Sequence, residues 1–284
     1  MTTRRIGVFD SGIGGLSVLQ ALQAELPGHD FVYVADSGHA PYGERSDHFV
    51  QARARTVTEW LLTQQIDALV VACNTATAAA IARLRHDYPA LPIVGVEPAL
   101  KPAASLSTTG HVAIMATRST LASEKFKALL ASMQGAVHIA EQPCDGLATA
   151  IERAVAPGQD ADMIALCQRY IDSLGGRRRF GTMAGDIDTL VLGCTHYSFA
   201  RDILQALTGP DVNLIDTGPA VARQTRRLLN AMMSAAAGTA PQTSKRTPED
   251  SQTRLVSTGL PGQLQAAARR WLSDPLATEE LIFL

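Results

Sequence analysis

The sequence predicts an α/β protein with two pseudo-symmetric domains, each built on a parallel sheet, and an active site in the cleft between them. Two observations carry this expectation. Short apolar runs alternate with helical patterns along the chain, which is typical of parallel sheets covered by helices. One frame also occurs twice, because residues 67–75 read DALVVACNT and residues 188–196 read DTLVLGCTH. A frame repeated at a fixed interval indicates two related halves.

The first half of the chain predicts short buried strands, each followed by a helix. Leu16, Leu19 and Leu22 have helical spacing, and the apolar run of the first frame is typical of a buried parallel strand. The expected strands are 6–9, 31–35, the run before Cys73, and 93–96. The expected helices are 16–26, 46–65 and 75–85.

The second half repeats this alternation. Residues 235–253 lack apolar periodicity and predict a flexible surface excursion. The expected strands are 112–115, 137–140, the run before Cys194, 213–215 and 255–258. The expected helices include 147–155, 157–180, 199–207, one ending near 233, and 261–272.

Composition excludes several classes of protein. The 284 residues carry a formal net charge of −2 and contain no long basic run, so we expect no nucleic-acid partner. No apolar stretch approaches the ~20 residues of a membrane span. No secretory leader precedes the first strand, so the protein is expected to be soluble and cytoplasmic. Four cysteines without metal-site spacing predict reduced thiols and no structural zinc. The substrate is expected to be small.

Cys73 and Cys194 each follow the apolar run of one frame. In open parallel sheets, ligands bind at the carboxyl ends of the strands, so these are candidate catalytic thiols. Two thiols from similar halves could face one substrate from opposite sides. The alternative is simple packing, because cysteine is among the most often buried residue types. Cys144 and Cys167 lack the frame and are interpreted as ordinary thiols.

Other candidates lie in loops that follow strands. Asp10 and Ser11 open a glycine-rich turn whose spacing does not match a dinucleotide site, so we expect no Rossmann cofactor. Asp10 could equally be a helix cap or turn residue. Tyr42 and Gly43 offer a hydroxyl and a backbone amide, although such a turn often has no further role. Glu152, taken alone, is an exposed helix charge.

Four motifs in register carry a resemblance: IGVFDSGIGG at 6–15, APYG at 40–43, ACNTA at 72–76 and LGCTHY at 192–197. On these motifs the chain resembles the cofactor-independent glutamate racemases of the aspartate/glutamate racemase superfamily. The resemblance implies interconversion of L- and D-glutamate, which supplies D-glutamate for peptidoglycan, and it implies no cofactor. It also implies that the C-terminal segment completes the first domain, giving domains of 1–97 with 209–284 and of 98–208.

The resemblance also implies roles for individual residues. Cys73 and Cys194 are the two acid/base residues, assisted by Asp10 and His196 respectively. Glu152 falls where the family often has an assisting carboxylate, although Asp145 stands before it where relatives commonly have proline. The implied substrate contacts are Asp10, Ser11, Tyr42, Gly43, Asn74, Thr75, Thr195 and His196.

Chemistry independent of the resemblance fits the same scheme. Racemisation removes a weakly acidic α-proton from one face and returns a proton to the other, so two bases across the α-carbon are suitable. A thiol has a reference pKa of roughly 8.5 and interconverts with its thiolate near neutral pH in a suitable environment. We therefore expect one cysteine to begin as thiolate and the other as thiol, without a Schiff-base cofactor.

Three alternatives stay open. The chain could racemise another substrate of the superfamily, such as aspartate, hydantoin or a malonate derivative. It could bind amino acids without turnover, although paired cysteines argue for turnover. It could also be a cysteine-nucleophile hydrolase with His196 as base, in which case the second cysteine has no role. A homodimer is the default assembly for a soluble oligomer, and the sequence adds nothing to it.

Overall fold

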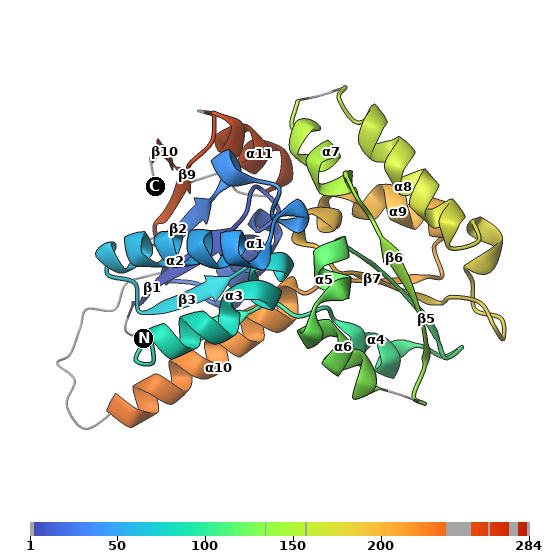
Figure 1. Cartoon of the computed structure of the whole chain (residues 1–284), viewed down its shortest axis with the longest axis horizontal. Helices are drawn as coiled ribbons and strands as arrows, with labels where there is room; N and C mark the ends of the chain where they lie inside the picture. The colour runs from blue at the N-terminus through green and yellow to red at the C-terminus, as the bar shows by residue number, and fades with distance from the viewer. Residues whose placement is uncertain are drawn as a thin grey trace. The chain divides into compact units, whose positions relative to one another are not determined.

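The computed structural model describes residues 3–133, 135–156, 158–236, 251–260, 262–272 and 278–282. The chain divides into two compact units, of which the first contains Met1–Val96 with Gly218–Leu284 and the second contains Glu97–Thr217 (Figure 1). Each unit holds one sheet, and every strand pairing in the described residues is parallel. The predicted class of two parallel-sheet α/β domains is therefore confirmed.

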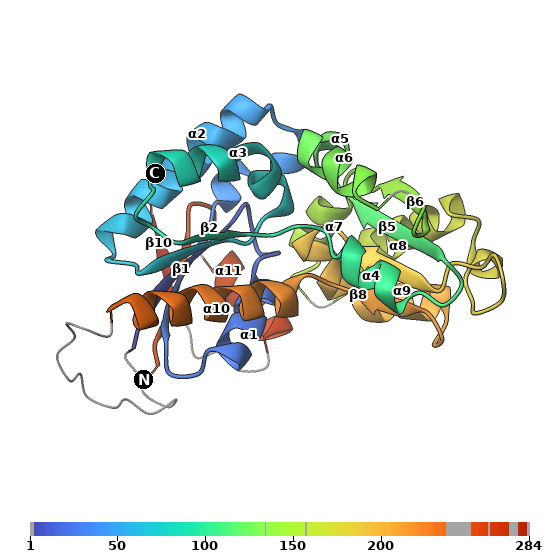
Figure 2. The ribbon, with the colours of Figure 1, turned by 90° about the horizontal axis from the view of Figure 1, so that it is seen from below.

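The sheet of the first unit has the order β10-β9-β2-β1-β3-β4. Figure 2 shows α2 and α3 on one side of this sheet and α1 and α10 on the other. The strands are β1 (Arg5–Asp10), β2 (Asp30–Ala35), β3 (Ala68–Val71), β4 (Ile93–Gly95), β9 (Thr253–Ser257) and β10 (Thr278–Leu281). The helices are α1 (Leu16–Glu25), α2 (Asp47–Thr63), α3 (Asn74–Asp87), α10 (Gly218–Ala236) and α11 (Gln263–Trp271).

The sheet of the second unit has the order β6-β5-β7-β8. Its strands are β5 (His111–Ala116), β6 (His138–Pro143), β7 (Thr189–Leu192) and β8 (Asn213–Ile215). Its helices are α4 (Leu100–Leu106), α5 (Arg118–Ala122), α6 (Glu124–Ala131), α7 (Leu147–Arg153), α8 (Ala161–Ser173) and α9 (Arg201–Thr208). Short 3-10 turns lie at Ser37–His39, Tyr42–Glu44, Arg177–Arg179 and Thr195–Ala200.

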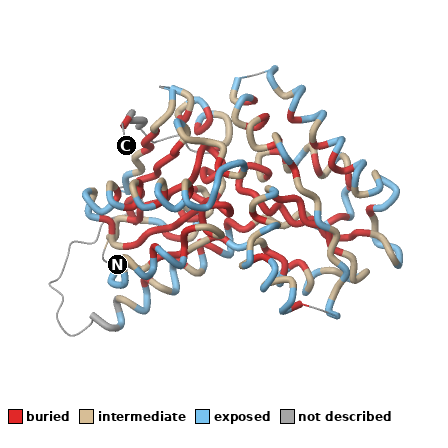
Figure 3. Tube along the Cα trace, in the orientation of Figure 1, coloured by how far each residue is buried: buried red, intermediate tan, exposed pale blue. Residues whose placement is uncertain are grey.

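Alternation along β5 separates the two faces of the second sheet. Ala113 and Met115 pack in one buried cluster with residues of α7, α8 and α9, whereas Val112 and Ile114 pack in another with α4 and α6. Successive side chains of a strand point to opposite faces, so a strand covered on both faces must be apolar throughout. The buried strands and the exposed outer helix surfaces are visible in Figure 3.

Four strands of each unit follow the same plan. The orders β2-β1-β3-β4 and β6-β5-β7-β8 correspond strand by strand. The Ala72 N–H donates to the Phe9 carbonyl at 2.7 Å, and the Gly193 N–H donates to the Met115 carbonyl at the same distance. Each of these bonds immediately precedes a cysteine of the repeated frame. The frame therefore occupies the same backbone position in both sheets.

The aspartate that begins each frame anchors its strand. Asp67 accepts the Arg5 N–H at 2.8 Å, and Asp188 accepts the Thr108 and Thr109 N–H groups at 2.6 and 2.9 Å. Burial alone would raise the pKa of Asp188, but bonds from Ser107, Thr109 and Thr108 lower it to about 2. Both aspartates are therefore structural and tie the start of a cysteine strand to the start of its neighbour.

Several predicted boundaries need correction. The second unit extends to Thr217 instead of 208, because β8 pairs with β7. The helix predicted for 157–180 is only Ala161–Ser173, since Gly175 and Gly176 take positive φ values of 105° and 66° and leave the helical conformation. The helix predicted from Phe199 begins at Arg201, after a 3-10 turn.

The C-terminal part of the first unit also differs from prediction. Of the predicted excursion at 235–253, residues 235 and 236 end α10 and Thr253 begins β9, while 237–250 lie outside the described residues. Strand β10 was not predicted at all. None of the helices in the described ranges is long and apolar enough to cross a membrane.

Candidate active site

Cys73 lies at the carboxyl end of β3 and is the N-cap residue of α3. Its Sγ accepts the Ala76 N–H at 3.4 Å and lies 3.6 Å from Ser11 Oγ. Ser11 comes from the end of β1, the neighbouring strand. The parallel sheet thus brings a thiol and a hydroxyl together at one edge.

Asp10 continues this chain of polar groups. Its side chain is fully buried, and Oδ1 accepts the Gly12 N–H at 2.8 Å and the Ser11 hydroxyl at 3.4 Å. Asp10 does not cap α1, because the N-cap of that helix is Gly15 and has no side-chain cap. A Cβ on Gly15 would lie 2.6 Å from the Asp10 Cβ, so glycine is needed there for Asp10 to fit.

Asn74 and Thr75 begin α3 directly after Cys73 and are both buried. The amide nitrogen and oxygen of Asn74 have no hydrogen-bond partner among the described residues. An unsatisfied buried amide is costly and needs an explanation, such as a polar ligand. Asn74 is therefore a good candidate for contact with a substrate.

Tyr42 is buried near this site, but its hydroxyl hydrogen is already in use. The hydroxyl donates to Asp36 Oδ2 at 2.5 Å. Burial, followed by the charge of Asp36 and this bond, raises the pKa of Tyr42. The hydroxyl donor that the sequence suggested is thus bound to Asp36, which leaves the phenolic oxygen as an acceptor. Gly43 lies in the same short 3-10 turn.

Asp36 is a polar centre that the sequence reasoning missed. It is fully buried, and Arg53 holds both carboxylate oxygens at 2.9 Å. His39 and Thr258 also donate to it, at 3.0 and 2.8 Å. Burial alone would raise the pKa of Asp36, but the bonds from Arg53, Tyr42 and Thr258 lower it. Asp36 directly follows a buried strand, and this position in the sequence could have identified it as a candidate.

Cys194 lies at the equivalent edge of the second sheet, next to a different set of groups. Its Sγ is 3.7 Å from His196 Nδ1, and His196 Nε2 is 2.7 Å from Glu152 Oε1 on α7. Burial alone would lower the pKa of His196, but bonds to and charges on Cys194 and Glu152 raise it well above its usual value. The side chain of Glu152 is only 15% exposed, so it is not an exposed helix charge.

Two threonines complete this edge of the second sheet. Thr195 is buried beside Cys194. Thr117 follows β5 as Ser11 follows β1, and sequence reasoning missed it. Its hydroxyl donates to the Thr120 hydroxyl at 2.9 Å and accepts the Thr120 N–H at 3.2 Å. Thr117 comes shortly after the apolar run 112–115, and this position at a strand end was the available signal.

The other two cysteines lie in the apolar core of the second unit. Burial raises the pKa of Cys144, and it raises that of Cys167 to about 12. Thiols of this kind are inert.

Within each unit the predicted residues gather around one cysteine. Asp10, Ser11 and Cys73 are linked in the first unit, and Glu152, His196 and Cys194 in the second. Across the described ranges, no group of three or more His, Cys, Asp or Glu side chains could hold a metal ion.

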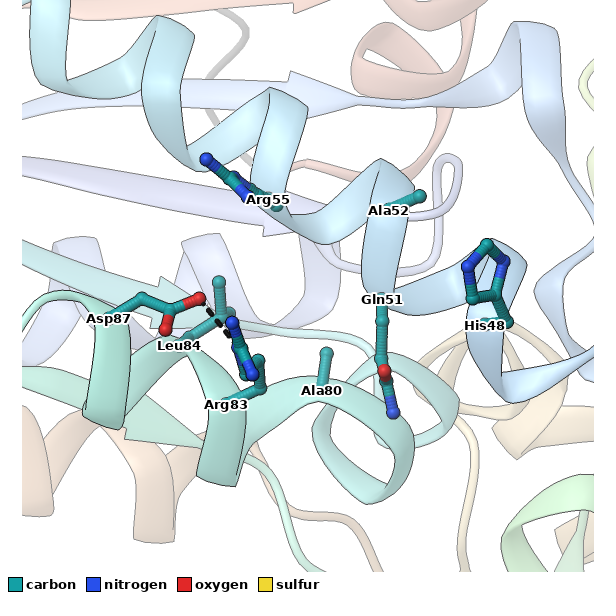
Figure 4. Close-up of a pocket in the computed structure, with 8 residues that line it drawn as sticks. All are labelled: His48, Gln51, Ala52, Arg55, Ala80, Arg83, Leu84 and Asp87. Atoms are coloured by element: carbon teal, nitrogen blue, oxygen red, sulfur yellow. Dashed lines mark hydrogen bonds and ion pairs between the residues drawn. The ribbon is translucent and has the colours of Figure 1, made fainter.

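A surface hollow of about 290 Å³ lies elsewhere, between α2 and α3 (Figure 4). Its lining includes the ion pair Arg83–Asp87 and none of the predicted site residues. We do not consider it a candidate for catalysis.

Comparisons with known proteins point to one group. The model of the Asp/Glu/Hydantoin racemase family matches residues 6–225. The glutamate racemase of Ectopseudomonas mendocina is 50% identical over 224 residues, which are 79% of this chain and 81% of that protein. That of Ralstonia pickettii is 46% identical over 243 residues, covering 84% and 82%.

Solved structures of glutamate racemases also match this chain. Escherichia coli glutamate racemase, in complex with L-glutamate and the activator UDP-MurNAc-Ala, has a TM-score of 0.81 at 28% identity and covers 100% of both chains. A glutamate racemase isoform of Bacillus anthracis has a TM-score of 0.79 at 28% identity and covers 99% and 98%. Both folds match this chain over at least 99% of its length.

Proposed function

Because the chain belongs to the Asp/Glu/Hydantoin racemase family, we propose that it interconverts L- and D-glutamate, with one cysteine taking the α-proton and a second cysteine giving a proton to the opposite face. The observation that carries this proposal is the matched pair of thiols, each at the carboxyl end of the third strand of its sheet and each with its own polar partners. Membership of the family makes the protein a racemase. Glutamate as the substrate follows from the names of relatives that are 45–50% identical.

In the proposed reaction, the two thiols act on opposite faces of the α-carbon. The C–H bond of L-glutamate breaks as its proton moves to Cys194, and Cys73 gives its proton to the opposite face of the carbanion. The reverse reaction starts at Cys73. This scheme requires a cleft between the two domains, and that cleft stays a prediction.

The remaining residues are proposed to bind the substrate and to stabilise the charge that develops on it. Hydrogen-bond donors directed at a developing anion are among the strongest contributions to catalysis. The unpartnered Asn74 amide supports a role of this kind. Ser11, Thr75 and Thr195 add hydroxyl groups at the same strand ends, of which the Ser11 hydroxyl already donates to Asp10. Asp10 and His196 adjust the proton affinity of the thiols.

Racemisation of pure L-glutamate, followed by circular dichroism or chiral chromatography, tests the activity. We expect turnover to survive dialysis against a chelator and treatment with a carbonyl reagent, because the scheme uses only side chains. Activity that is lost and then restored by pyridoxal phosphate would rule the scheme out. A panel of D- and L-amino acids separates glutamate from aspartate, and binding without turnover would favour the amino-acid-binding alternative.

Isotope exchange tests the two-base step. In deuterated water the product should carry solvent deuterium from the first turnover, while recovered substrate stays largely protiated at early times. A single base would return the original proton to part of the product. A supply of D-glutamate for peptidoglycan, a cytoplasmic location and a homodimer stay predictions.

A further inference from the structure

We propose that Thr258, directly after β9, is a positioning residue that holds the loop after β2 in the shape that binds the substrate. This β2 loop, residues 36–45, carries Tyr42 and Gly43. Thr258 acts on it through Asp36 and Gly38, without contact with the substrate. The role rests on the proposed function, in which Tyr42 and Gly43 bind glutamate. Thr258 lies beyond the family match, which ends at residue 225.

The backbone places Thr258 at the same sheet edge as the residues around Cys73. Strands β1, β2 and β9 are parallel neighbours, so their carboxyl ends lie at one edge. The Asp36 N–H donates to the Asp10 carbonyl at 2.9 Å. The Thr258 N–H donates to the Ala35 carbonyl at 3.1 Å. The hydrogen bonds of the sheet therefore continue past the strands and bring Thr258 beside the start of the β2 loop.

The Thr258 hydroxyl makes two hydrogen bonds to this loop. It donates to Asp36 Oδ1 at 2.8 Å and accepts the Gly38 N–H at 3.1 Å. A hydroxyl can donate and accept at once, and a bond to a carboxylate is stronger than one between neutral groups. One side chain thus connects the end of β9 to a buried charge and to a backbone amide of the loop.

The backbones of the two segments also meet directly. A Cβ on Gly38 would collide with the Thr258 carbonyl oxygen, and a Cβ on Gly259 would lie 2.7 Å from the Ser37 Cβ. Glycine is therefore needed on both segments for this approach. The contact is so close that a change in the path of one segment must move the other.

Asp36 connects this contact to the residues around Cys73. Its Oδ2 accepts the Tyr42 hydroxyl at 2.5 Å, and Tyr42 packs in the same buried cluster as Cys73. The short turn that contains Tyr42 and Gly43 contacts α3, whose N-cap is Cys73. A shift of Asp36 and Gly38 would therefore move the phenolic oxygen and the Gly43 amide away from their positions for binding.

Removal of the Thr258 hydroxyl should loosen the loop and leave the first unit folded. Arg53 and His39 also contact Asp36 Oδ1, at 2.9 and 3.0 Å, so the buried carboxylate keeps its other partners. Gly38 is exposed, so its N–H can bond to water in place of the hydroxyl. The loss is therefore local, and parts of a protein can open without global unfolding.

Thr258→Val tests the proposal, because valine keeps the shape of threonine and lacks the hydroxyl. Thr253→Val is the matched control, since Thr253 begins the same strand and its hydroxyl accepts the Gln23 amide at 3.0 Å. We expect Thr258→Val to raise KM for both enantiomers of glutamate by about tenfold, the size of one lost bond to a charged group, and to change kcat less than about threefold. Thr258→Ser should restore the native KM, and Thr253→Val should not change it.

Hydrogen–deuterium exchange without glutamate tests the loop itself. In Thr258→Val, a peptide that covers residues 36–44 should exchange at least about tenfold faster than in the unaltered protein. Peptides from β1 and β3 should keep their native rates, and so should residues 36–44 in Thr253→Val. Gly38→Ala is an independent variant that keeps the hydroxyl and displaces the loop by the collision described above. It should raise KM in the same way.

Native exchange of residues 36–44 in Thr258→Val, or equal effects of Thr258→Val and Thr253→Val, would overturn the proposal. Glutamate racemisation with an unchanged KM in Thr258→Val would also overturn it and would leave the proposed function standing. Weaker glutamate binding by Thr258→Val, measured by calorimetry on a protein that does not racemise glutamate, would overturn the proposed function and support this role of Thr258.

Discussion

The surroundings of Cys73 and Cys194 share a backbone plan and differ in chemistry. Each thiol follows the third strand of its unit in chain order, within a set of four strands that have corresponding orders in the two sheets. A matched N–H bond precedes each thiol. Cys73 then meets a hydroxyl and a carboxylate, whereas Cys194 meets an imidazole and a carboxylate. The repeated frame fixes where the thiols lie, and we propose that the different neighbours of each thiol decide how it handles a proton.

This difference suits the proposed reaction. A protein of L-amino acids cannot be its own mirror image, although its two substrates are mirror images. The two sides can therefore perform one task with different groups beside their cysteines. Variants on each side test whether the two thiols contribute equally.

The largest effect is expected from removing either thiol. Cys73→Ala and Cys194→Ala should each lower racemisation in both directions by at least about a thousandfold, because each direction needs an acid and a base. Polarimetry starting from each pure enantiomer measures this loss. A Cys194→Ala protein that racemises at the native rate would show that a single base does the work.

Serine in place of each cysteine sharpens the comparison. In Cys73→Ser any residual α-proton abstraction should favour L-glutamate, and in Cys194→Ser it should favour D-glutamate, since only the surviving thiol acts as base. Release of α-tritium from each enantiomer reports the preference. Equal release from both enantiomers would contradict the assignment of faces.

The groups beside the thiols should have smaller effects. Asp10→Asn and His196→Asn are each expected to lower kcat by about a hundredfold, the usual size of an acid/base contribution. Steady-state kinetics checks this, with the exposed residues Asp211 and His86 changed to Asn as matched controls. Full turnover in both site variants would mean that the partners of the thiols are misassigned.

The buried ion pair between Asp36 and Arg53 in the first unit should matter mainly for stability. Asp36→Ala leaves Arg53 without its carboxylate, and breaking such a pair costs about 3 kcal/mol. Urea denaturation measures the loss. The exposed pair Arg55–Glu59 is the control, because Glu59→Ala should cost less than about 1 kcal/mol. Equal effects of the two variants would show that burial of the Asp36–Arg53 pair does not increase its contribution to stability.

The smallest effect concerns the anchor of the second cysteine strand. The pKa of Asp188 is lowered to about 2, so its contribution is present above its unfolded pKa of ~3.9 and is lost as pH falls towards 2. Asp188→Asn should therefore cost about 2 kcal/mol at pH 7 and progressively less below pH 4. Denaturation curves at several pH values test this, and a cost that does not change with pH would contradict it.

Much of the fold follows from local patterns. Strands covered on both faces are continuous apolar runs, so the runs before Cys73 and Cys194 were visible in the sequence. Strand β10 reads TEEL and lacks such a run, so periodicity could not reveal it. The predicted helix at 157–180 was too long because its helical pattern was extended past Gly175 and Gly176. The positive φ values of these two glycines are not helical.

From residue patterns alone, the site was predictable only where it follows the strand ends. Cys73 comes directly after an apolar run and was selected on that basis, whereas Asn74 was assigned by the resemblance. The contact between His196 and Glu152 joins residues that are 44 positions apart on different elements, and no periodicity encodes it. The many donors to Asp36 likewise come from separate segments, including Thr258 at a distance of 222 positions.

The split first unit has a consequence for synthesis of the chain. The second unit is one continuous stretch and is complete once residue 217 has left the ribosome, whereas β2 of the first unit pairs with β9 at residues 253–257. Domains generally fold as units during synthesis, and pairing between distant segments is slow. The second unit can therefore fold while the first still exposes one edge of its sheet. The half of the protein that starts first is the last to finish.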